Sequence, residues 1–238
     1  MKKHILLFIF ILGLTMGYPS PCKAKDHNIF FNDKKKPSRK KIDLPAPKTE
    51  GSTSLEKVLQ NRRSVREYRN KPLALKDISQ LLWAAQGITD RQTGKRTAPS
   101  AGALYPLEIY LTVQNCKNLS PGIYHYLPRE HEIELTSKRT VNKRLAQGAL
   151  GQMFIARAAI NLIITADYSV TTSKYTKKGI TYLHMEAGHA AQNVYLQAES
   201  LNLGTVSVGA FEEEKIKNTL NLPQGLTPLY IMPVGKPR

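Results

Sequence analysis

Cysteine is scarce in this sequence. Only Cys22 and Cys116 occur among 238 residues, and removal of an N-terminal segment that includes Cys22 would leave Cys116 alone. An internal disulfide framework is therefore excluded for the mature chain that we expect. A chain without disulfides has to draw its stability from a buried apolar core, and 238 residues are enough for one sizeable core.

Long apolar runs are also scarce. The apolar stretch from Ile5 to Leu14 is shorter than the roughly 20 residues that a membrane-spanning helix needs. It follows two lysines and leads to small residues around Ala24, which is the layout of a secretory signal peptide. We therefore expect residues 1–24 to be a signal peptide and the protein to be exported to the periplasm or cell envelope. An uncleaved membrane anchor is the alternative.

Acidic residues are few. Only 18 of them accompany 35 lysines and arginines, which gives a formal net charge of +17. Part of the excess lies in residues 25–50, where KKKPSRKK is followed by DLPAPKTEG and apolar residues are rare. This composition is typical of a disordered basic linker, so we expect the folded domain at residues 51–238. The charge that remains suits a phosphate-bearing partner, but no recognition motif accompanies it, and we expect no nucleic-acid partner.

Hydrophobic periodicity in the domain predicts both helices and strands. The stretch LKDISQLLWAAQG carries apolar residues at helical spacing and ends at Gly87, and GIYHYLPREHEIELT has the pattern of a hairpin. Helices are predicted over residues 55–61, 75–86, 180–201 and 211–221, and strands over residues 107–115, 158–165, 204–210 and 227–235. The expected fold class is α+β, with a central mixed sheet flanked by helices.

A cluster of arginines lies where the first predicted helix ends. In QNRRSVREYR, the residues Arg62, Arg63 and Arg66 surround Ser64. The planar fork of arginine fits phosphate oxygens, and a serine hydroxyl can donate to the same group. Taken alone, the cluster is compatible with a phosphate site or with an ordinary solvated surface.

Two further stretches are rich in small residues. One is RTAPSAGALYPLEIYL, which leads into a predicted strand, and the other is GTVSVGAFEEEKI, which leads from a strand into a helix. Backbone amides in such stretches can approach a ligand closely because no large side chains stand between them. Ordinary connecting loops are the alternative.

Together these stretches resemble the nitroreductase superfamily of FMN-binding flavoproteins, and most closely its branch of SagB-type dehydrogenases, which includes azoline oxidases. The resemblance covers about residues 55–237. It is carried by RRSVREY, APSAGALYPLEIYL, GIYHYLPREHEIEL, MEAGHAAQNVYLQAESLNLGT and LYIMPVGKP. It implies a nitroreductase-like fold, FMN as the cofactor and an intertwined homodimer with the flavin at the subunit interface.

The resemblance also implies which residues bind FMN. It assigns the phosphate and ribityl end to Arg62, Arg63, Ser64 and Arg66, with further phosphate contacts at Lys236 and Arg238. It places Pro99, Ser100, Ala101, Gly102 and Ala103 along the isoalloxazine, partly from the other subunit, and Val208, Gly209 and Ala210 by the reactive N5 edge.

A possible catalytic pair follows from the same resemblance. In azoline oxidases a neighbouring lysine and tyrosine are associated with catalysis, and Lys174 and Tyr175 stand at the matching place before the long helix. A lysine near a flavin can act as a base. The alternative is that both are loop residues on a basic surface.

The histidines do not predict a metal site. His184 and His189 flank Glu186, but a spacing of five residues turns the two rings roughly 140° apart on a helix. We therefore interpret these three residues as core or interface positions. His125 and His131 fall in the predicted hairpin and are interpreted as surface polar groups.

The sequence thus predicts an exported FMN-dependent oxidoreductase that transfers two electrons to or from a small-molecule or peptide substrate. Its electron donor or acceptor is unknown at this point. Export disfavours NAD(P)H as the donor, because nicotinamide is scarce outside the cytoplasm. Two alternatives are an NAD(P)H-dependent nitro or quinone reductase and a non-catalytic flavin-binding protein.

Overall fold

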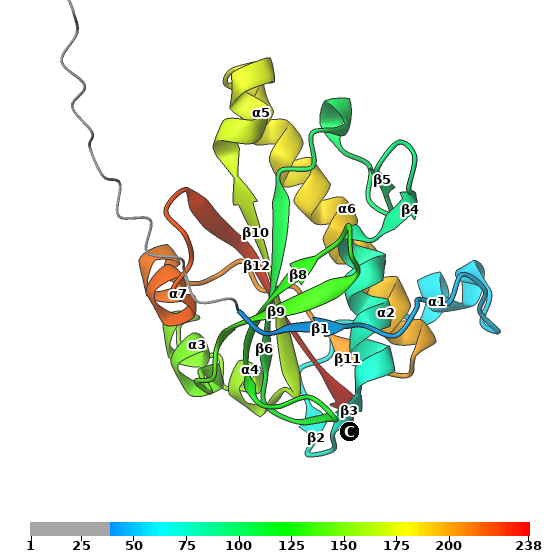
Figure 1. Cartoon of the computed structure of the whole chain (residues 1–238). Coiled ribbons are helices and arrows are strands. Elements are labelled where there is room, and N and C mark those ends of the chain that lie inside the picture. Colours follow the sequence, from blue (N-terminus) through cyan, green and yellow to red (C-terminus); the bar gives the residue numbers. More distant parts are fainter. Residues whose placement is uncertain (1–38) are drawn as a thin grey trace, which may run out of the picture. The chain divides into compact units, whose positions relative to one another are not determined.

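The computed structural model describes residues 39–238, which fold around one sheet (Figure 1). Its strands follow the order β1-β9-β8-β6-β10-β12-β11, and β2 pairs with β12. The bounds are β1 Lys41–Asp43, β2 Tyr68–Arg69, β6 Leu107–Val113, β8 Gly122–Leu127, β9 Glu132–Ser137, β10 Ile160–Asp167, β11 Gly204–Thr205 and β12 Leu226–Pro237. These strand pairs are antiparallel, and a parallel bridge between Ser64 and Thr205 makes the sheet mixed.

Helices and short strands surround this sheet. The helices are α1 Leu55–Asn61, α2 Leu75–Gln86, the 3₁₀ turn η1 Ala101–Ala103, α3 Asn142–Gly148, α4 Phe154–Arg157, α5 Tyr168–Tyr175, α6 Lys178–Ser200 and α7 Glu213–Leu220. The short strands are β3 Leu73–Ala74, β4 Ile88–Asp90, β5 Lys95–Arg96 and β7 Cys116–Lys117. Within residues 39–238, no helix has both the length and the apolar character that crossing a membrane requires.

Strand β10 shows how both faces of the sheet are covered. Ile160, Leu162 and Ile164 belong to an apolar cluster with residues of α2 and α6, whereas Ile163 belongs to a second cluster with residues of α3, α4 and α7. Neighbouring residues of a strand point to opposite faces, so each face carries its own layer of helices. The apolar run that predicted this strand is explained by burial on both sides.

The main predicted elements are present, with shifted ends. The long helix runs over Lys178–Ser200 rather than residues 180–201, and the predicted hairpin forms β8 and β9. The stretch predicted as a strand over residues 204–210 is a strand only at Gly204–Thr205. Helices α3, α4 and α5 were not predicted, and α5 contains Lys174 and Tyr175, for which loop positions were the alternative.

The prediction of a disordered linker over residues 25–50 is wrong for the part that the structure describes. Lys41–Asp43 forms the edge strand β1, where Ile42 pairs with Ile133, and the following residue, Leu44, is buried in the core. Farther along, the backbone N–H and C=O of Lys48 both bond to the side chain of Gln80, at 2.8 and 3.0 Å. Residues 25–38 of the predicted linker and the predicted signal peptide lie outside the described residues.

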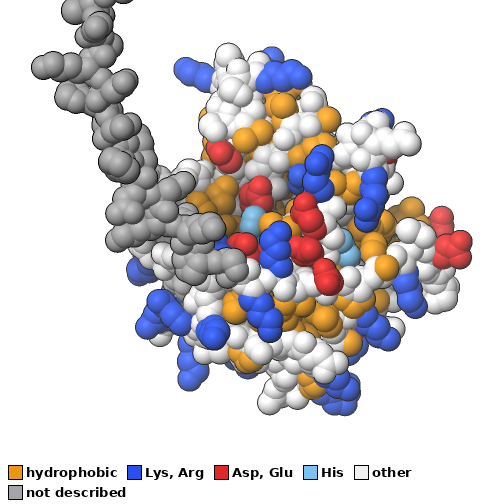
Figure 2. All heavy atoms as spheres, viewed as in Figure 1, with side chains coloured by type: hydrophobic (Ala, Val, Ile, Leu, Met, Phe, Trp, Pro, Cys, Tyr) orange, Lys and Arg blue, Asp and Glu red, His pale blue; other side chains and the backbone are white. Residues whose placement is uncertain are grey.

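Opposite charges explain why so basic a segment joins the sheet. Arg39 lies 3.2 Å from a carboxylate oxygen of Glu134, and Lys41 lies 3.4 Å from one of Glu132, both on β9. Figure 2 shows acidic side chains near the middle of this face, with lysines and arginines spread around them. The linker prediction depended on the low overall hydrophobicity of the segment, which does not show these local contacts of Ile42 and Leu44 and the two ion pairs.

His131, which was interpreted as a surface polar group, is half-buried and hydrogen-bonded. Its Nε2 lies 2.7 Å from Oγ of Ser79 and 3.1 Å from the carbonyl oxygen of Pro45, and its Nδ1 lies 2.9 Å from Oη of Tyr126. Burial lowers the pKa of His131. The ring therefore connects the hairpin turn to α2 and to the segment that follows β1.

Candidate active site

The arginine segment runs along an edge of the sheet. Helix α1 ends at Asn61, and the backbone becomes extended at Arg62, with φ −48° and ψ 124°. Ser64 then bridges to Thr205, and the N–H of Val65 donates to the carbonyl of Thr205 at 2.9 Å. Residues two positions apart in an extended segment point the same way, so alternation along this segment predicts one side for Arg62, Ser64 and Arg66.

The three arginines have different surroundings. Arg62 lies over the ring of Tyr195, 5.0 Å from its centroid, and Arg66 lies over the ring of Phe154 at 5.9 Å. Nη1 of Arg63 instead donates to the carbonyl oxygens of Gln60 and Arg62, at 2.8 and 2.9 Å, and so satisfies the end of α1. None of the three forms an ion pair with an acidic residue among residues 39–238.

Tyr195 of α6 joins the arginine segment to the chain that follows β11. Its Oη accepts the N–H of Ser207 at 2.8 Å and lies 3.1 Å from Oγ of Ser64. Burial alone would raise the pKa of Tyr195, but hydrogen bonds with Ser207 and Ser64 and the charge of Arg62 lower it. Sequence reasoning missed Tyr195 because it falls on the apolar stripe of α6, where residues are assigned to packing. Only its hydroxyl group indicated that it could also form hydrogen bonds.

The predicted flavin-lining stretch forms a tight turn. The carbonyl of Ser100 accepts the N–H of Ala103 at 3.1 Å, and its Oγ accepts the N–H of Tyr105 at 2.9 Å. Gly102, Ala103 and Tyr105 have φ values of 63°, 53° and 51°, a left-handed conformation that costs a residue with a side chain roughly 1 kcal/mol. Pro99, Gly102 and Ala103 are exposed, so the turn presents backbone and small side chains at the surface.

The predicted catalytic pair lies against this turn. Lys174 and Tyr175 belong to the last turn of α5, whose Asp167 cap accepts the N–H of Ser169 at 2.9 Å. A Cβ atom at Gly102 would lie 2.5 Å from Oη of Tyr175 and 2.8 Å from Nζ of Lys174. The structure therefore brings together two groups of predicted residues that are separated by more than 70 positions in the sequence.

The ring of Tyr175 is held from the other side by α6. It packs edge to face against Tyr182, with 5.2 Å between the ring centroids, and Nζ of Lys174 lies 5.5 Å from the Tyr175 ring centroid. Lys174 is exposed and Tyr175 is half-buried. The lysine head is thus accessible while the tyrosine ring is fixed.

The third predicted stretch leaves the sheet next to β12. Val208 is buried and exchanges two backbone hydrogen bonds with Ile231, both 2.9 Å long. Gly209 and Ala210 are exposed, and the carbonyl of Ala210 accepts a hydrogen bond from Gln152 at 3.0 Å. The backbone of Gly209 is therefore exposed to a ligand, whereas the carbonyl of Ala210 is already bonded.

Lys236 and Arg238 line two different cavities. Lys236 lines a cavity of about 400 Å³ with Arg69, Lys71 and Lys117. Arg238 lines one of about 230 Å³ with Glu67, Tyr68 and Arg157. Their contact with the same phosphate as Arg62 and Arg66 stays a prediction.

Comparisons with known proteins agree with this geometry. The sequence pattern of the nitroreductase family matches residues 59–236. MJ1384, a nitroreductase-family protein of Methanocaldococcus jannaschii, is 52% identical over 182 residues, which is 76% of this chain and 90% of that protein. The crystal structure of a nitroreductase-family protein from Ralstonia eutropha has a TM-score of 0.73 at 31% identity and matches 85% of this chain and 92% of its own.

A third relative is the microcin B17-processing protein McbC of Escherichia coli. It is 29% identical over 178 residues, which is 70% of this chain and 63% of McbC. The fold also resembles a chain of the E. coli microcin synthetase McbBCD complex with truncated pro-MccB17 bound, with a TM-score of 0.63 at 24% identity, over 83% of this chain and 77% of that one. The predicted family and fold are confirmed, and the chain belongs to the nitroreductase family.

Proposed function

We propose that this nitroreductase-family oxidoreductase binds FMN and oxidises a small-molecule or peptide substrate by two electrons, with Lys174 as the base. The observation that carries this proposal is the contact of Gly102, in the expected flavin-lining turn, with Lys174 and Tyr175. A base and a cofactor have to reach neighbouring atoms of the same substrate, and this contact supports such an arrangement.

The residues present fit FMN. Arg62 and Arg66 occupy alternate positions after the end of α1 and have no acidic partner among the described residues, which leaves their charges free for an anion. The exposed backbone at Gly102 and Gly209 fits a planar ring, because neither position carries a side chain. When bound, FMN would supply the two-electron transfer at its N5 atom.

The chain's own groups would then handle the proton. In its neutral form, Nζ of Lys174 accepts a proton from the substrate carbon or nitrogen next to the carbon that is oxidised. Oη of Tyr175 can donate a hydrogen bond to a substrate heteroatom, and packing against Tyr182 holds its ring in place. A second substrate then accepts the two electrons and completes the cycle.

Similarity to McbC supports a peptide among the possible substrates. McbC is named for microcin B17 processing, and the McbBCD complex was solved with a truncated pro-peptide bound. The present chain spans 63% of McbC, so a shared substrate class is part of the proposal. Export is proposed as well, and it would make the substrate itself, rather than NAD(P)H, the source of electrons.

Anaerobic reduction of the purified protein tests this function. We expect FMN to copurify, and a thiazoline-containing model peptide to bleach the flavin absorbance faster than NADPH does. Rapid bleaching by NADPH alone would instead favour the nitro or quinone reductase. A protein whose flavin reacts with neither compound, or that binds no flavin, would contradict the proposed oxidoreductase.

We also propose a homodimer. Exposed apolar side chains occur on α1 at Leu55 and Leu59 and on α6 at Ile180 and Met185, with exposed fractions of 58, 50, 41 and 56%. Contact with a second copy would remove these side chains from water.

Light scattering at micromolar concentration is expected to give twice the chain mass, and Met185→Glu is expected to shift the protein toward monomer. An FMN-loaded monomer of the unsubstituted protein would contradict the dimer.

A further inference from the structure

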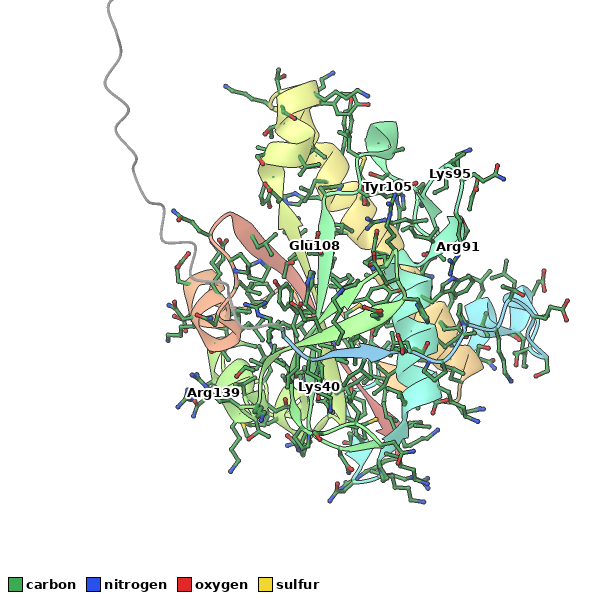
Figure 3. The ribbon with its side chains drawn as sticks, viewed as in Figure 1. Lys40, Arg91, Lys95, Tyr105, Glu108 and Arg139 are labelled. Atoms are coloured by element: carbon green, nitrogen blue, oxygen red, sulfur yellow. The ribbon has the colours of Figure 1, made fainter. Side chains whose placement is uncertain are left out.

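Arg96 and Tyr105 stand at the two ends of the turn that the resemblance places along the flavin. Arg96 is the last residue of β5, and Tyr105 comes just before Pro106 and β6. Figure 3 shows Tyr105 beside the hairpin that carries Lys95. The chain therefore leaves this hairpin at Arg96, forms the turn and returns to the hairpin at Tyr105.

Two direct contacts join these ends. The backbone N–H of Arg96 donates to Oη of Tyr105 at 3.2 Å, and the guanidinium carbon of Arg96 lies 4.7 Å from the centroid of the Tyr105 ring. A guanidinium within about 6 Å of an aromatic ring centroid is attracted to the ring. The N–H of Tyr105 also donates to Oγ of Ser100 at 2.9 Å. Tyr105 thus contacts one end of the turn with its side chain and the inside of the turn with its backbone.

The start of the turn is fixed to the end of α2. Nη1 of Arg96 donates to Oε1 of Gln86, which is fully buried, at 2.9 Å. The next residue, Thr97, donates its N–H to the carbonyl of Gly87 at 2.9 Å and its hydroxyl to the carbonyl of Trp83 at 3.0 Å. Because Arg96 also contacts Tyr105, it connects this anchor to the other end of the turn.

Both residues carry a cost at this place. Arg96 is half-buried, its Nε has no hydrogen-bond partner within residues 39–238, and it forms no ion pair with an acid of that range. Removing a charged group from water costs free energy that a neutral side chain would avoid. Tyr105 has a left-handed φ of 51°, which is also unfavourable for a residue with a side chain. Such costs at both ends of one turn point to a functional reason for its conformation.

The turn that is closed in this way carries Gly102, which lies against the proposed catalytic pair. We propose that Arg96 and Tyr105 are positioning residues that form a clasp at the base of residues 97–104. The clasp keeps Gly102 where the cofactor and the catalytic pair can meet a substrate, and neither residue has to touch the cofactor to do so. This inference rests on the proposed function, since it takes the turn as a lining of the FMN site.

Hydrogen exchange in FMN-free protein tests the clasp itself. Tyr105→Phe keeps the ring next to the guanidinium but loses the hydroxyl that accepts the Arg96 N–H, and Arg96→Met loses the guanidinium. We expect the amides of residues 97–105 to exchange about fivefold faster in Tyr105→Phe and about tenfold faster in Arg96→Met. Mass spectrometry of peptide fragments measures this, and fragments from the core strand β10 should exchange at the unsubstituted rate. Acceleration of β10 by the same factor would show general destabilisation and would overturn the clasp.

Fluorescence titration with FMN tests the positioning role. A turn that has lost its clasp has to be ordered when the cofactor binds, so we expect Tyr105→Phe to bind FMN about fivefold more weakly and Arg96→Met about tenfold more weakly. Arg96→Lys keeps the charge but not the planar group that lies over the ring, and it should bind as weakly as Arg96→Met. An Arg96→Lys protein with the affinity of the unsubstituted protein would overturn the clasp, because charge alone would then be sufficient.

Two matched controls separate the clasp from a general loss of a charge or a hydroxyl. Lys95→Met removes the exposed positive charge next to Arg96. Tyr124→Phe removes a hydroxyl of β8 that donates to the carbonyl of Ser120 at 2.7 Å. Both should leave the exchange of residues 97–105 and the FMN affinity within about twofold of the unsubstituted protein.

The clasp and the proposed function can fail separately. Faster exchange of residues 97–105 in both clasp variants of a protein that binds no FMN would support the clasp while refuting the proposed function. Unchanged exchange and unchanged affinity in both variants of a protein that does bind FMN would overturn the clasp and leave the proposed function standing. Faster exchange with unchanged FMN affinity would overturn the positioning role.

Discussion

Replacing Arg62 and Arg66 together by alanine is expected to weaken FMN binding by about a hundredfold or more. Each charge-assisted hydrogen bond to a phosphate contributes about 1.5–3 kcal/mol, and every 1.4 kcal/mol changes affinity tenfold. The two residues occupy alternate positions of the segment, and neither pairs with an acid among the described residues, so their charges are available to the phosphate. Flavin content after purification and fluorescence titration with FMN measure the effect.

Arg63→Ala is the matched control for this experiment. It removes the same charge one residue away, but from a guanidinium that donates to two carbonyl oxygens at the end of α1. We expect a loss of about 1 kcal/mol in the free energy of unfolding and less than a tenfold loss in FMN affinity. If Arg63→Ala weakens FMN binding as much as the double substitution does, or if the folded double variant keeps its flavin, the phosphate assignment is wrong.

This control shows where sequence reasoning stopped. The arginine cluster could be found in QNRRSVREYR, and the resemblance gave it a phosphate to bind, but all three arginines received the same role. Their difference depends on the extended backbone after Asn61 and on the position of the Gln60 carbonyl. Those are properties of the folded chain that residue type and spacing do not contain.

The elements that sequence reasoning found have strong periodicity. The apolar stripe of α6 and the alternation in β8 and β9 continue long enough to be recognised. Helix α5 has no such stripe, because YSVTTSKY buries only Thr171, and its cap at Asp167 was the remaining signal. Strand β1 was missed because three residues at a sheet edge are too few to outweigh a basic composition.

The polar residues inside the core were the hardest to predict. Glu186 and Tyr195 occupy positions of α6 that otherwise carry alanine, leucine or valine, and a helical pattern assigns such positions to packing. Ser64, the partner of Tyr195, comes from a segment far away in the sequence. The sequence therefore located the ligand-facing stretches of the site, whereas the side chains that connect those stretches required the tertiary structure.

Lys174→Ala is expected to slow substrate-dependent reduction of the flavin by about a hundredfold to ten-thousandfold, the range typical of a general base. FMN affinity should change little, because the resemblance places Lys174 near the reacting end of the cofactor and the arginines at its phosphate. Stopped-flow reduction under anaerobic conditions, with a thiazoline-containing peptide as the electron source, measures the rate. Reduction by dithionite, which needs no base, should proceed normally and shows that the flavin site is intact.

Three comparisons separate a base from a basic surface residue. Lys178→Ala removes an exposed lysine at the start of α6, four positions away, and should leave the rate within about twofold. Tyr175→Phe keeps the ring that packs on Tyr182 but loses the hydroxyl next to Gly102, and it should slow the reaction without releasing FMN. Added ethylamine should restore part of the rate of Lys174→Ala, because a small amine can occupy the space of the missing side chain and accept the proton. A Lys174→Ala rate close to that of Lys178→Ala, with no effect of ethylamine, would leave the contact between Lys174 and Gly102 as packing and would remove the base from the proposed mechanism.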